Sequence, residues 1–309
     1  MYLADRRHRA MGSDAQVLVY AATQEAADEL AHLALVRVQL LEQCWSRFRA
    51  DSELSLLNDR AGQGPVIVSP DLETLVATML EAAAWSDGVY DPTVLGAVRA
   101  HGYDADFAEV IARDSLRAID EALAPSRGTA GIVLDRDQHT LSLPSGVGID
   151  PGAIGKGLAA DIIADEIHAA GAEGVLVNLG GDVCVRGTAG GSAWTIGIQD
   201  DRSADSPVVH QIELTGQRRA VATSSSLRRR WSGRHHVIDP FTGQPSQSDL
   251  AQVSVAAPTG WQAEAATTYA LVRGAQAATD WLEANGFEAL LFPHDPASAP
   301  LRVRETLHV

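Results

Sequence analysis

The sequence contains only two cysteines, Cys44 and Cys184, among 309 residues. Two thiols cannot build a disulfide framework, and by themselves they cannot supply the four ligands of a structural zinc site. Free cysteines are among the most buried residue types and behave as small apolar side chains. We therefore expect both to be reduced thiols in the core.

Positive charge is also scarce. Lys and Arg total 24, whereas Asp and Glu total 40, so the formal net charge at pH 7 is −16. A surface of that sign repels nucleic acid and anionic membranes, which argues against either as the main partner. An anionic ligand is still compatible with the chain, because a local basic cluster or a metal ion can override the average field.

Long apolar runs are missing. No stretch approaches the roughly 18 apolar residues of a membrane-spanning helix. The Arg6–Arg7 pair near the N-terminus is not followed by the apolar run of a signal peptide. We therefore expect a cytoplasmic protein without signal peptide, lipid anchor or membrane span, unless a leader was trimmed.

The chain lacks internal repeats, low-complexity segments and any linker long enough to mark a domain boundary. Hydrophobic residues make up 46% of it, so a sizeable core is expected. Apolar residues at helical spacing predict helices at 23–48, 69–88, 156–170, 263–273 and 275–284. β-Branched runs predict strands at 14–21, 252–258 and 287–293, a hairpin at 131–144 and several strands between 174 and 225. Because helices and strands mix without a regular βαβ repeat, the expected class is α+β, in a single domain covering 1–309, with two intertwined subdomains as an option.

One glycine-rich stretch, "GIDPGAIGKGLAAD" from Gly148 to Asp161, raises the question of a phosphate loop. A Walker loop requires glycine five residues before the glycine that precedes lysine, but Asp150 occupies that position. It also requires Ser or Thr after Lys156, where Gly157 stands. The dinucleotide fingerprint fails as well, because Pro151 replaces its third glycine. From these residues alone, a turn that starts a helix remains the simplest interpretation.

Another segment suggests a metal site. Glu264 and Thr268 stand four residues apart in a predicted helix, so their oxygens lie on one face. A carboxylate beside a hydroxyl suits a hard cation such as Mg²⁺ or Ca²⁺. Taken singly, each residue is more simply interpreted as an ordinary helix residue.

Taken together and in this order, several segments resemble the ApbE family, the Mg²⁺-dependent FAD:protein FMN transferases. The resemblance covers most of the chain. Its motifs are "MGSDAQV" at 11–17, "RFRADSELSLLN" at 47–58, "DGVYDPTV" at 87–94, "IDPGAIGKGLAAD" at 149–161, "VNLGGDVCVRG" at 177–187, "HHVIDPFTGQP" at 235–245 and "AEAATTYALVRG" at 263–274. The resemblance implies an α+β fold of the tunnel-fold type, with mixed sheets, flanking helices and a flavin cleft.

The resemblance also implies roles for individual residues. FAD is the implied substrate, and its implied contacts are Met11, Val89, Tyr90, Asp91, Asp150, Lys156, His236 and Ile238. The implied ligands of Mg²⁺ are the carbonyl of Ala153 and the side chains of Glu264 and Thr268.

This chain departs from the family at one of these metal ligands. The family motif A-D-A-x-x-T has aspartate where Glu264 stands. Glutamate is one methylene longer, and Mg²⁺ requires near-ideal octahedral geometry. The position of the ion, its identity or the rate of the reaction is therefore expected to differ.

The implied reaction transfers FMN from FAD to a Ser or Thr hydroxyl of an acceptor protein and releases AMP. The hydroxyl needs a general base, and His236 is the candidate, with neighbouring His235 as its competitor. A histidine that only stacks on the flavin or hydrogen-bonds to it is the alternative role. Two other functions stay open: an FAD pyrophosphate hydrolase that releases FMN and AMP, and a non-catalytic FAD-binding protein.

Overall fold

The structure is a computed structural model that describes residues 1–113, 125–203, 205–215 and 219–304. The chain divides into two compact units. Unit 1 consists of Met1–Leu40, Lys156–Leu227 and Ser248–Val309, and unit 2 of Leu41–Gly155 and Arg228–Gln247. Each unit therefore combines segments that are far apart in the sequence.

Unit 1 is built on one eight-stranded sheet with the strand order β1-β2-β6-β7-β10-β15-β16-β17. Neighbouring strands are antiparallel throughout. The strands are β1 (Tyr2–Ala10), β2 (Ser13–Ala21), β6 (Gly174–Leu179), β7 (Asp182–Gly187), β10 (Ala220–Ser225), β15 (Leu250–Ala257), β16 (Glu288–Pro293) and β17 (Leu301–Val303).

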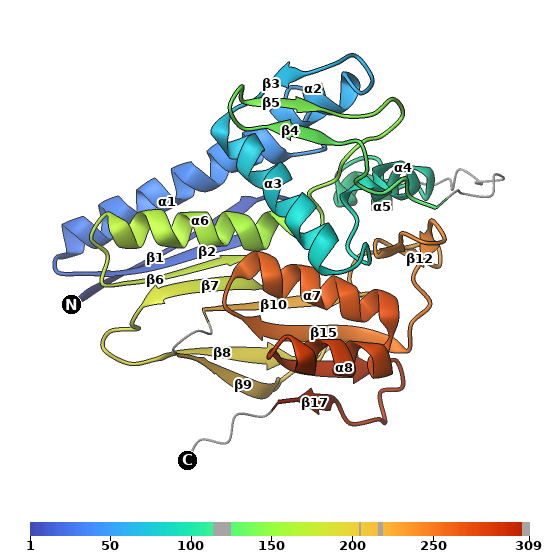
Figure 1. Ribbon diagram of the computed structural model, residues 1–309. Coiled ribbons are helices and arrows are strands. Elements are labelled where there is room, and N and C mark those ends of the chain that lie inside the picture. The colour runs from blue at the N-terminus through green and yellow to red at the C-terminus, as the bar shows by residue number, and fades with distance from the viewer. Residues whose placement is uncertain (114–124, 204, 216–218, 305–309) are drawn as a thin grey trace. The chain divides into compact units, whose positions relative to one another are not determined.

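Helices cross one face of this sheet (Figure 1). They are α1 (Gln24–Trp45, in this unit as far as Leu40), α6 (Gly155–Ala169, in this unit from Lys156), α7 (Gly260–Arg273) and α8 (Ala275–Ala284). A hairpin of β8 (Trp194–Gln199) and β9 (Val208–Leu214) packs on the other face.

Successive side chains along β7 point to opposite faces of the sheet, so this strand contributes to the packing on both faces. Val183 and Val185 join an apolar cluster with Trp194 of the β8–β9 hairpin. Cys184, which lies between them, points to the helical face, where its Sγ is 3.6 Å from the carbonyl oxygen of Gly157. Polar residues at the even-numbered positions of β7 are therefore directed toward α6 and α7.

Two glycines bring the first turns of α6 and α7 into contact. A Cβ atom on Gly157 would lie 2.3 Å from the carbonyl oxygen of Gly260, which is far inside van der Waals distance. A Cβ atom on Gly260 would lie 2.4 Å from both the carbonyl oxygen of Gly157 and the Sγ of Cys184. Only glycine fits at either position, so these residues fix the place where the two helix N-termini meet.

Unit 2 contains a three-stranded sheet in the order β3-β5-β4 and two small hairpins, β11–β12 and β13–β14. Its strands are β3 (Val66–Ile67), β4 (Val133–Asp135), β5 (Thr140–Ser142), β11 (Arg230–Trp231), β12 (Arg234–His235), β13 (Ile238–Asp239) and β14 (Gln244–Pro245). Its helices are α2 (Glu53–Asp59), α3 (Pro70–Trp85), the 3₁₀ helix η1 (Pro92–Val94), α4 (Leu95–Ala100) and α5 (Phe107–Ala112).

The α+β prediction is confirmed, and most of the predicted elements are present. Helix α3 has the predicted cap: the hydroxyl of Ser69 accepts a hydrogen bond from the amide of Leu72, and Pro70 occupies the first turn. Strand β1 and helix α2 are among the elements that were not predicted. In β1 only Ala4 and Ala10 are buried, so the segment shows no alternation, and its pairing with β2 is what makes it a strand. Within the described residues, no helix is both long enough and apolar enough to cross a membrane.

Both cysteines are free thiols, as predicted. Cys184 is fully buried, and burial raises its pKa well above the ordinary value. Cys44 is only half-buried, so the expectation that it lies in the core is wrong in part. Burial, together with the nearby Glu53 carboxylate, still raises the pKa of Cys44 to about 12.

The contact between α6 and α7 gives a stability prediction. Gly157→Ala should lower the free energy of unfolding by about 1–3 kcal/mol, because the new methyl group would have to push backbone atoms apart. Gly96→Ala is the matched control, since Gly96 is an exposed helical glycine with nothing within 4 Å of the point where a Cβ atom would lie. It should be neutral or stabilising by about 0.5–1 kcal/mol. Urea denaturation of both variants measures the effects, and equal stabilities would contradict the close packing.

Candidate active site

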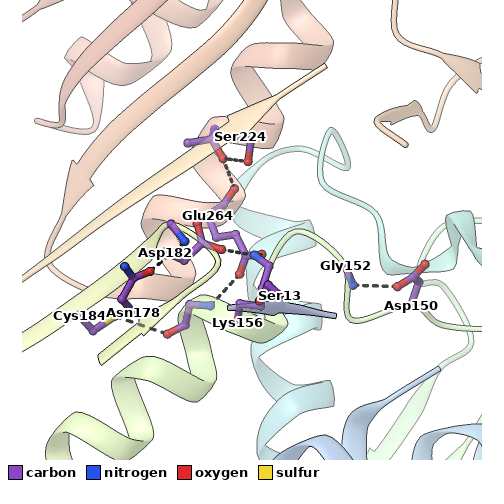
Figure 2. A network of polar contacts seen from close by, with 12 residues as sticks. Ser13, Asp150, Gly152, Lys156, Asn178, Asp182, Cys184, Ser224 and Glu264 are labelled. Carbon is purple, nitrogen blue, oxygen red and sulfur yellow. Dashed lines mark hydrogen bonds and ion pairs between the residues drawn. The ribbon is translucent and has the colours of Figure 1, made fainter. Parts of the chain in front are cut away.

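A buried ion-pair cluster lies between the sheet and the helices of unit 1 (Figure 2). The ammonium of Lys156 donates to Oδ2 of Asp182 and, at 2.8 Å, to Oε1 of Glu264. The other oxygen of Glu264 accepts the backbone N–H of Gly157 at 2.8 Å. The two carboxylate side chains are only 3% exposed, and the lysine side chain is 21% exposed. Two buried carboxylates therefore share one cation.

Three different elements position this cluster. Lys156 lies in the first turn of α6, Glu264 in the second turn of α7, and Asp182 at the start of β7. Asp182 directly follows a two-residue turn, Gly180–Gly181, in which both residues have positive φ (67° and 101°). Glycine adopts this conformation without strain, and the turn directs Asp182 onto the helical face. The contact between Gly157 and Gly260 brings Glu264 within reach of α6.

Burial controls the electrostatics of the cluster. Desolvation raises the pKa of Asp182 to about 6, with Lys156 acting to lower it and Glu264 to raise it. With both carboxylates ionised, one ammonium balances only half of their charge. A buried site with excess negative charge favours the binding of a further cation.

A second charge cluster adjoins the first along α6 and β7, with Arg186 and Asp161 buried and Asp165 exposed. Arg186 makes a bidentate ion pair with Asp165, at 2.5 and 2.8 Å, and lies 3.6 Å from Asp161. Asp161 also accepts the backbone N–H of Trp261 at 3.2 Å. Burial raises the pKa of Asp161, against the effect of the neighbouring backbone amides and of Arg186. This cluster ties α6 to α7 and β7.

In unit 2, Asp150 is held by a buried arginine that sequence analysis did not single out. The Nε atom of Arg47 lies 3.1 Å from Oδ2 of Asp150, and both side chains are less than a tenth exposed. The amide of Gly152 donates to the other oxygen at 2.8 Å. The guanidinium of Arg47 also stacks on the rings of Phe48 and Tyr103, at 4.0 and 4.4 Å. These contacts fix the orientation of Asp150.

Unit 2 also joins three motifs that are far apart in the sequence. The amide of Asp150 donates to the carbonyl of Pro92 at 2.8 Å, which links "IDPG" to "DGVYDP". Asp91 accepts the hydroxyl of Ser126, and the amide of Ser126 donates to the carbonyl of Pro240 at 2.8 Å. Ser126 therefore connects "DGVYDP" to "HHVIDP".

Both ring nitrogens of His235 contact backbone groups. Nδ1 of His235 accepts the backbone N–H of Val237 at 3.3 Å, and its Nε2 lies 3.0 Å from the carbonyl oxygen of Ser246. This pattern requires a neutral ring with the proton on Nε2, donating to Ser246. Because both nitrogens are engaged, His235 would lose a hydrogen bond on accepting a proton. These contacts weaken the case for His235 as a general base, and the role of His236 stays a prediction.

Comparison with known proteins identifies the family. The sequence pattern of the ApbE family matches residues 11–291. The chain belongs to the ApbE family. The FAD:protein FMN transferase of Treponema pallidum (strain Nichols) is 30% identical, with 98% of this chain and 88% of that protein aligned. The FAD:protein FMN transferase of Escherichia coli (strain K12) is also 30% identical, over 79% of this chain and 71% of that protein.

The fold of an ApbE protein has the same architecture. The crystal structure of the ApbE protein of Thermotoga maritima superposes with a TM-score of 0.84 at 26% identity, covering 98% of this chain and all of that one. The predicted ApbE-like α+β arrangement of sheets and flanking helices is therefore confirmed.

The metal site that the resemblance implies can be compared with the contacts of Glu264. Both of its carboxylate oxygens are already bonded, one to Lys156 and one to Gly157. Among the described residues, no group of three or more His, Cys, Asp or Glu side chains is arranged to hold a metal ion. Mg²⁺ commonly uses only one or two carboxylates and completes its shell with water and substrate phosphates. Because Asp182 and Glu264 already converge on one cation, their donor chemistry fits such an ion.

The other residues implied by the resemblance lie in both units. In unit 1, Met11 forms a hairpin turn with Gly12, both at positive φ (50° and 65°), and Thr268 is half-buried one turn after Glu264. In unit 2, Val89, Tyr90 and Ile238 are almost fully buried. Ala153 has φ of 69°, a left-handed conformation that is unusual for a residue with a side chain. Their contacts with FAD or a metal ion stay predictions.

Sequence reasoning missed Asp182, Arg47 and Ser126 as members of these networks. All three stand in or near segments that it quoted or predicted, but their partners are 26 to 114 positions away. The glycine pair before Asp182 was the available signal, because a tight turn after a strand directs the next side chain to a defined face.

The buried pair of Arg47 and Asp150 gives the second prediction. Arg47→Ala should lower the free energy of unfolding by about 3–5 kcal/mol, because it leaves a buried carboxylate without its cation. Arg49→Ala is the control, since Arg49 forms an exposed ion pair with Asp51 and its loss should cost less than about 1 kcal/mol. Chemical denaturation checks both values. Equal effects for the two variants would show that the Arg47 pair contributes no more than a surface pair.

Proposed function

We propose that this chain is an enzyme that transfers FMN from FAD to a Ser or Thr hydroxyl of an acceptor protein, with Mg²⁺ as cofactor and AMP as the second product. The buried Lys156–Asp182–Glu264 cluster carries the proposal, because it concentrates charge in the segments that match the ApbE family. The names of the relatives, FAD:protein FMN transferases, support the same reaction.

The reaction is an attack on a pyrophosphate. The acceptor oxygen forms a bond to the phosphorus of the FMN half, the bond from that phosphorus to the bridging oxygen breaks, and AMP leaves with that oxygen. Negative charge grows on the phosphate oxygens and on AMP, so cationic groups near them lower the barrier. Lys156, in the first turn of α6, supplies positive charge where the helix dipole also favours anions.

The residues proposed to hold Mg²⁺ are Glu264 and Thr268, with the carbonyl of Ala153 as the third ligand that the resemblance implies. When bound, Mg²⁺ would neutralise charge on the phosphate oxygens. The proposed FAD contacts are those that the resemblance implies, namely Met11, Val89, Tyr90, Asp91, Asp150, Lys156, His236 and Ile238.

His236 is proposed to take the proton of the acceptor hydroxyl. A histidine is suited to this role because its ordinary pKa lies near 6.5, close to neutral pH. The ring of His235 is committed to two backbone groups, which argues against His235 as the base.

One assay tests the proposed reaction. The protein is incubated with FAD and Mg²⁺, with and without a candidate acceptor domain encoded near its gene, and the flavin products are identified by mass spectrometry. We expect FMN on the acceptor, and none on an acceptor whose candidate Ser or Thr is replaced by Ala. Free FMN without transfer would indicate a pyrophosphate hydrolase. Bound but unchanged FAD would indicate a binding protein.

Replacing the proposed base should slow the reaction while substrate binding persists. His236→Ala should reduce the rate of transfer by about 10²–10⁴-fold with little change in FAD affinity, since general-base catalysis contributes that range. His235→Ala is the control and should affect the rate much less. Single-turnover kinetics and fluorescence titration of FAD measure the two quantities. An unchanged rate for His236→Ala would remove it as the base.

Changing Glu264 tests the metal ligands. Glu264→Ala should abolish Mg²⁺ binding and Mg²⁺-dependent transfer, because it removes the only carboxylate among the proposed ligands. Glu264→Asp restores the family residue and should keep or raise Mg²⁺ affinity, with less competition from Mn²⁺ and Ca²⁺. Isothermal titration of each protein with each metal gives the affinities. Equal Mg²⁺ affinities of the wild type and Glu264→Ala would place the ion elsewhere.

A further inference from the structure

The chain has one lysine and 23 arginines, and the lysine is Lys156. Apart from the histidines, all the other basic residues are arginines. The exception lies between two buried carboxylates, Asp182 and Glu264. Such a choice at this position indicates that the site requires an ammonium and not simply a positive charge.

The physical difference between the two side chains explains the choice. An ammonium is a compact point charge with three donors, whereas a guanidinium is a wide planar fork. Two carboxylate oxygens from different elements converge on the Nζ of Lys156. This arrangement, with oxygen donors around a small cation, is also the one that a hard metal ion uses.

Metal ligation and the ion pair need the same carboxylate. Oε1 of Glu264 accepts from Lys156, and Oε2 accepts from the amide of Gly157. Each oxygen keeps a lone pair that could ligate an ion, but a divalent ion on Oε1 would repel the ammonium that shares this oxygen. The amide is fixed at the start of α6, but the ammonium stands at the end of a flexible side chain, so it is the group that can move.

Asp182 provides a partner for the ammonium after such a move. Its Oδ2 already accepts from Lys156, and its Oδ1 is buried without a hydrogen bond of normal geometry within the described residues. Lys156 can therefore release Glu264 and still neutralise Asp182. The net charge of the cluster with both carboxylates ionised, −1, becomes +1 when a divalent ion is added.

We propose that the ammonium of Lys156 is the resident cation of a position formed by Asp182 and Glu264, and that a divalent ion binding at Glu264 displaces it onto Asp182 alone. This inference rests on the proposed metal dependence. It makes metal binding a competition within the protein, in which Lys156 keeps the buried carboxylates paired until the ion arrives. Asp182 is then a positioning residue for Lys156.

The competition between the Lys156 ammonium and a divalent ion is tested by measuring metal affinity in the absence of FAD. Lys156→Gln should bind Mg²⁺ and Mn²⁺ at least about tenfold more tightly than the wild type, because the competing cation is gone. Arg37→Gln is the control: Arg37 pairs with Glu166 on the surface of α1 and α6, so its loss removes one charge from the same unit without touching the cluster. Its affinity should stay within about twofold of the wild type. Unchanged or weaker metal binding by Lys156→Gln overturns the proposal, and so does a protein in which neither form binds either metal.

Displacement of the Lys156 ammonium can also be observed in the wild-type protein, so this test does not depend on the folding of a variant. Lys156 carries the single side-chain amine, so among amines acetic anhydride acetylates it and the terminal amine only. Saturating Mg²⁺ or Mn²⁺ should accelerate labelling of Lys156 by about fivefold or more, because the ammonium leaves one of its two carboxylates. The terminal amine serves as the internal reference. A rate that stays constant or falls on metal binding overturns the proposal.

Flavin transfer by the wild-type protein is measured in a separate assay. The displacement of Lys156 and the proposed function can therefore be refuted independently. Transfer with Mg²⁺, combined with unchanged affinity of Lys156→Gln, refutes the displacement and leaves the function standing. Tighter binding by Lys156→Gln and faster labelling, without transfer to any acceptor, support the displacement and refute the function.

Discussion

The site in unit 1 depends on one ammonium shared by two buried carboxylates. Lys156, Asp182 and Glu264 come from α6, β7 and α7, so their ion pairs hold two helices and the sheet at one point. A buried ion pair is weak evidence for stability, because desolvation offsets much of the Coulomb attraction. Its value here is positional, because it fixes two carboxylates and one ammonium relative to one another.

That arrangement is possible because two glycines allow the helix N-termini to touch. Gly157 and Gly260 leave no room for a Cβ atom, and the resulting approach lets Glu264 accept the N–H of Gly157. Close backbone packing and the ion pair therefore depend on each other. The neighbouring pair of Arg186 and Asp165 joins α6 to β7 in the same region.

Unit 2 also contains a buried ion pair, and there it orients a single carboxylate. Arg47 neutralises Asp150 within an aromatic setting, and Ser126 links Asp91 to the backbone at Pro240. These contacts hold three motifs of the ApbE family in fixed positions relative to one another. Asp150 is thus an anchored residue, whose carboxylate has two structural partners besides any ligand it binds.

The sequence by itself determined the α+β class, the family and most of the long helices and strands, because these depend on local periodicity, caps and motif order. It also identified Lys156 and Glu264, whose residue types and spacing signal chemistry. Strand β1 escaped detection because it is mostly exposed and is defined by its pairing with β2, not by an alternating pattern of its own. Only the tertiary structure decided that Glu264 is bonded to Lys156 and Gly157, 108 and 107 positions away, and that Asp182 completes the cluster. Contacts of that separation are set by how the helices pack on the sheet, and no local pattern encodes which side chains packing will bring together.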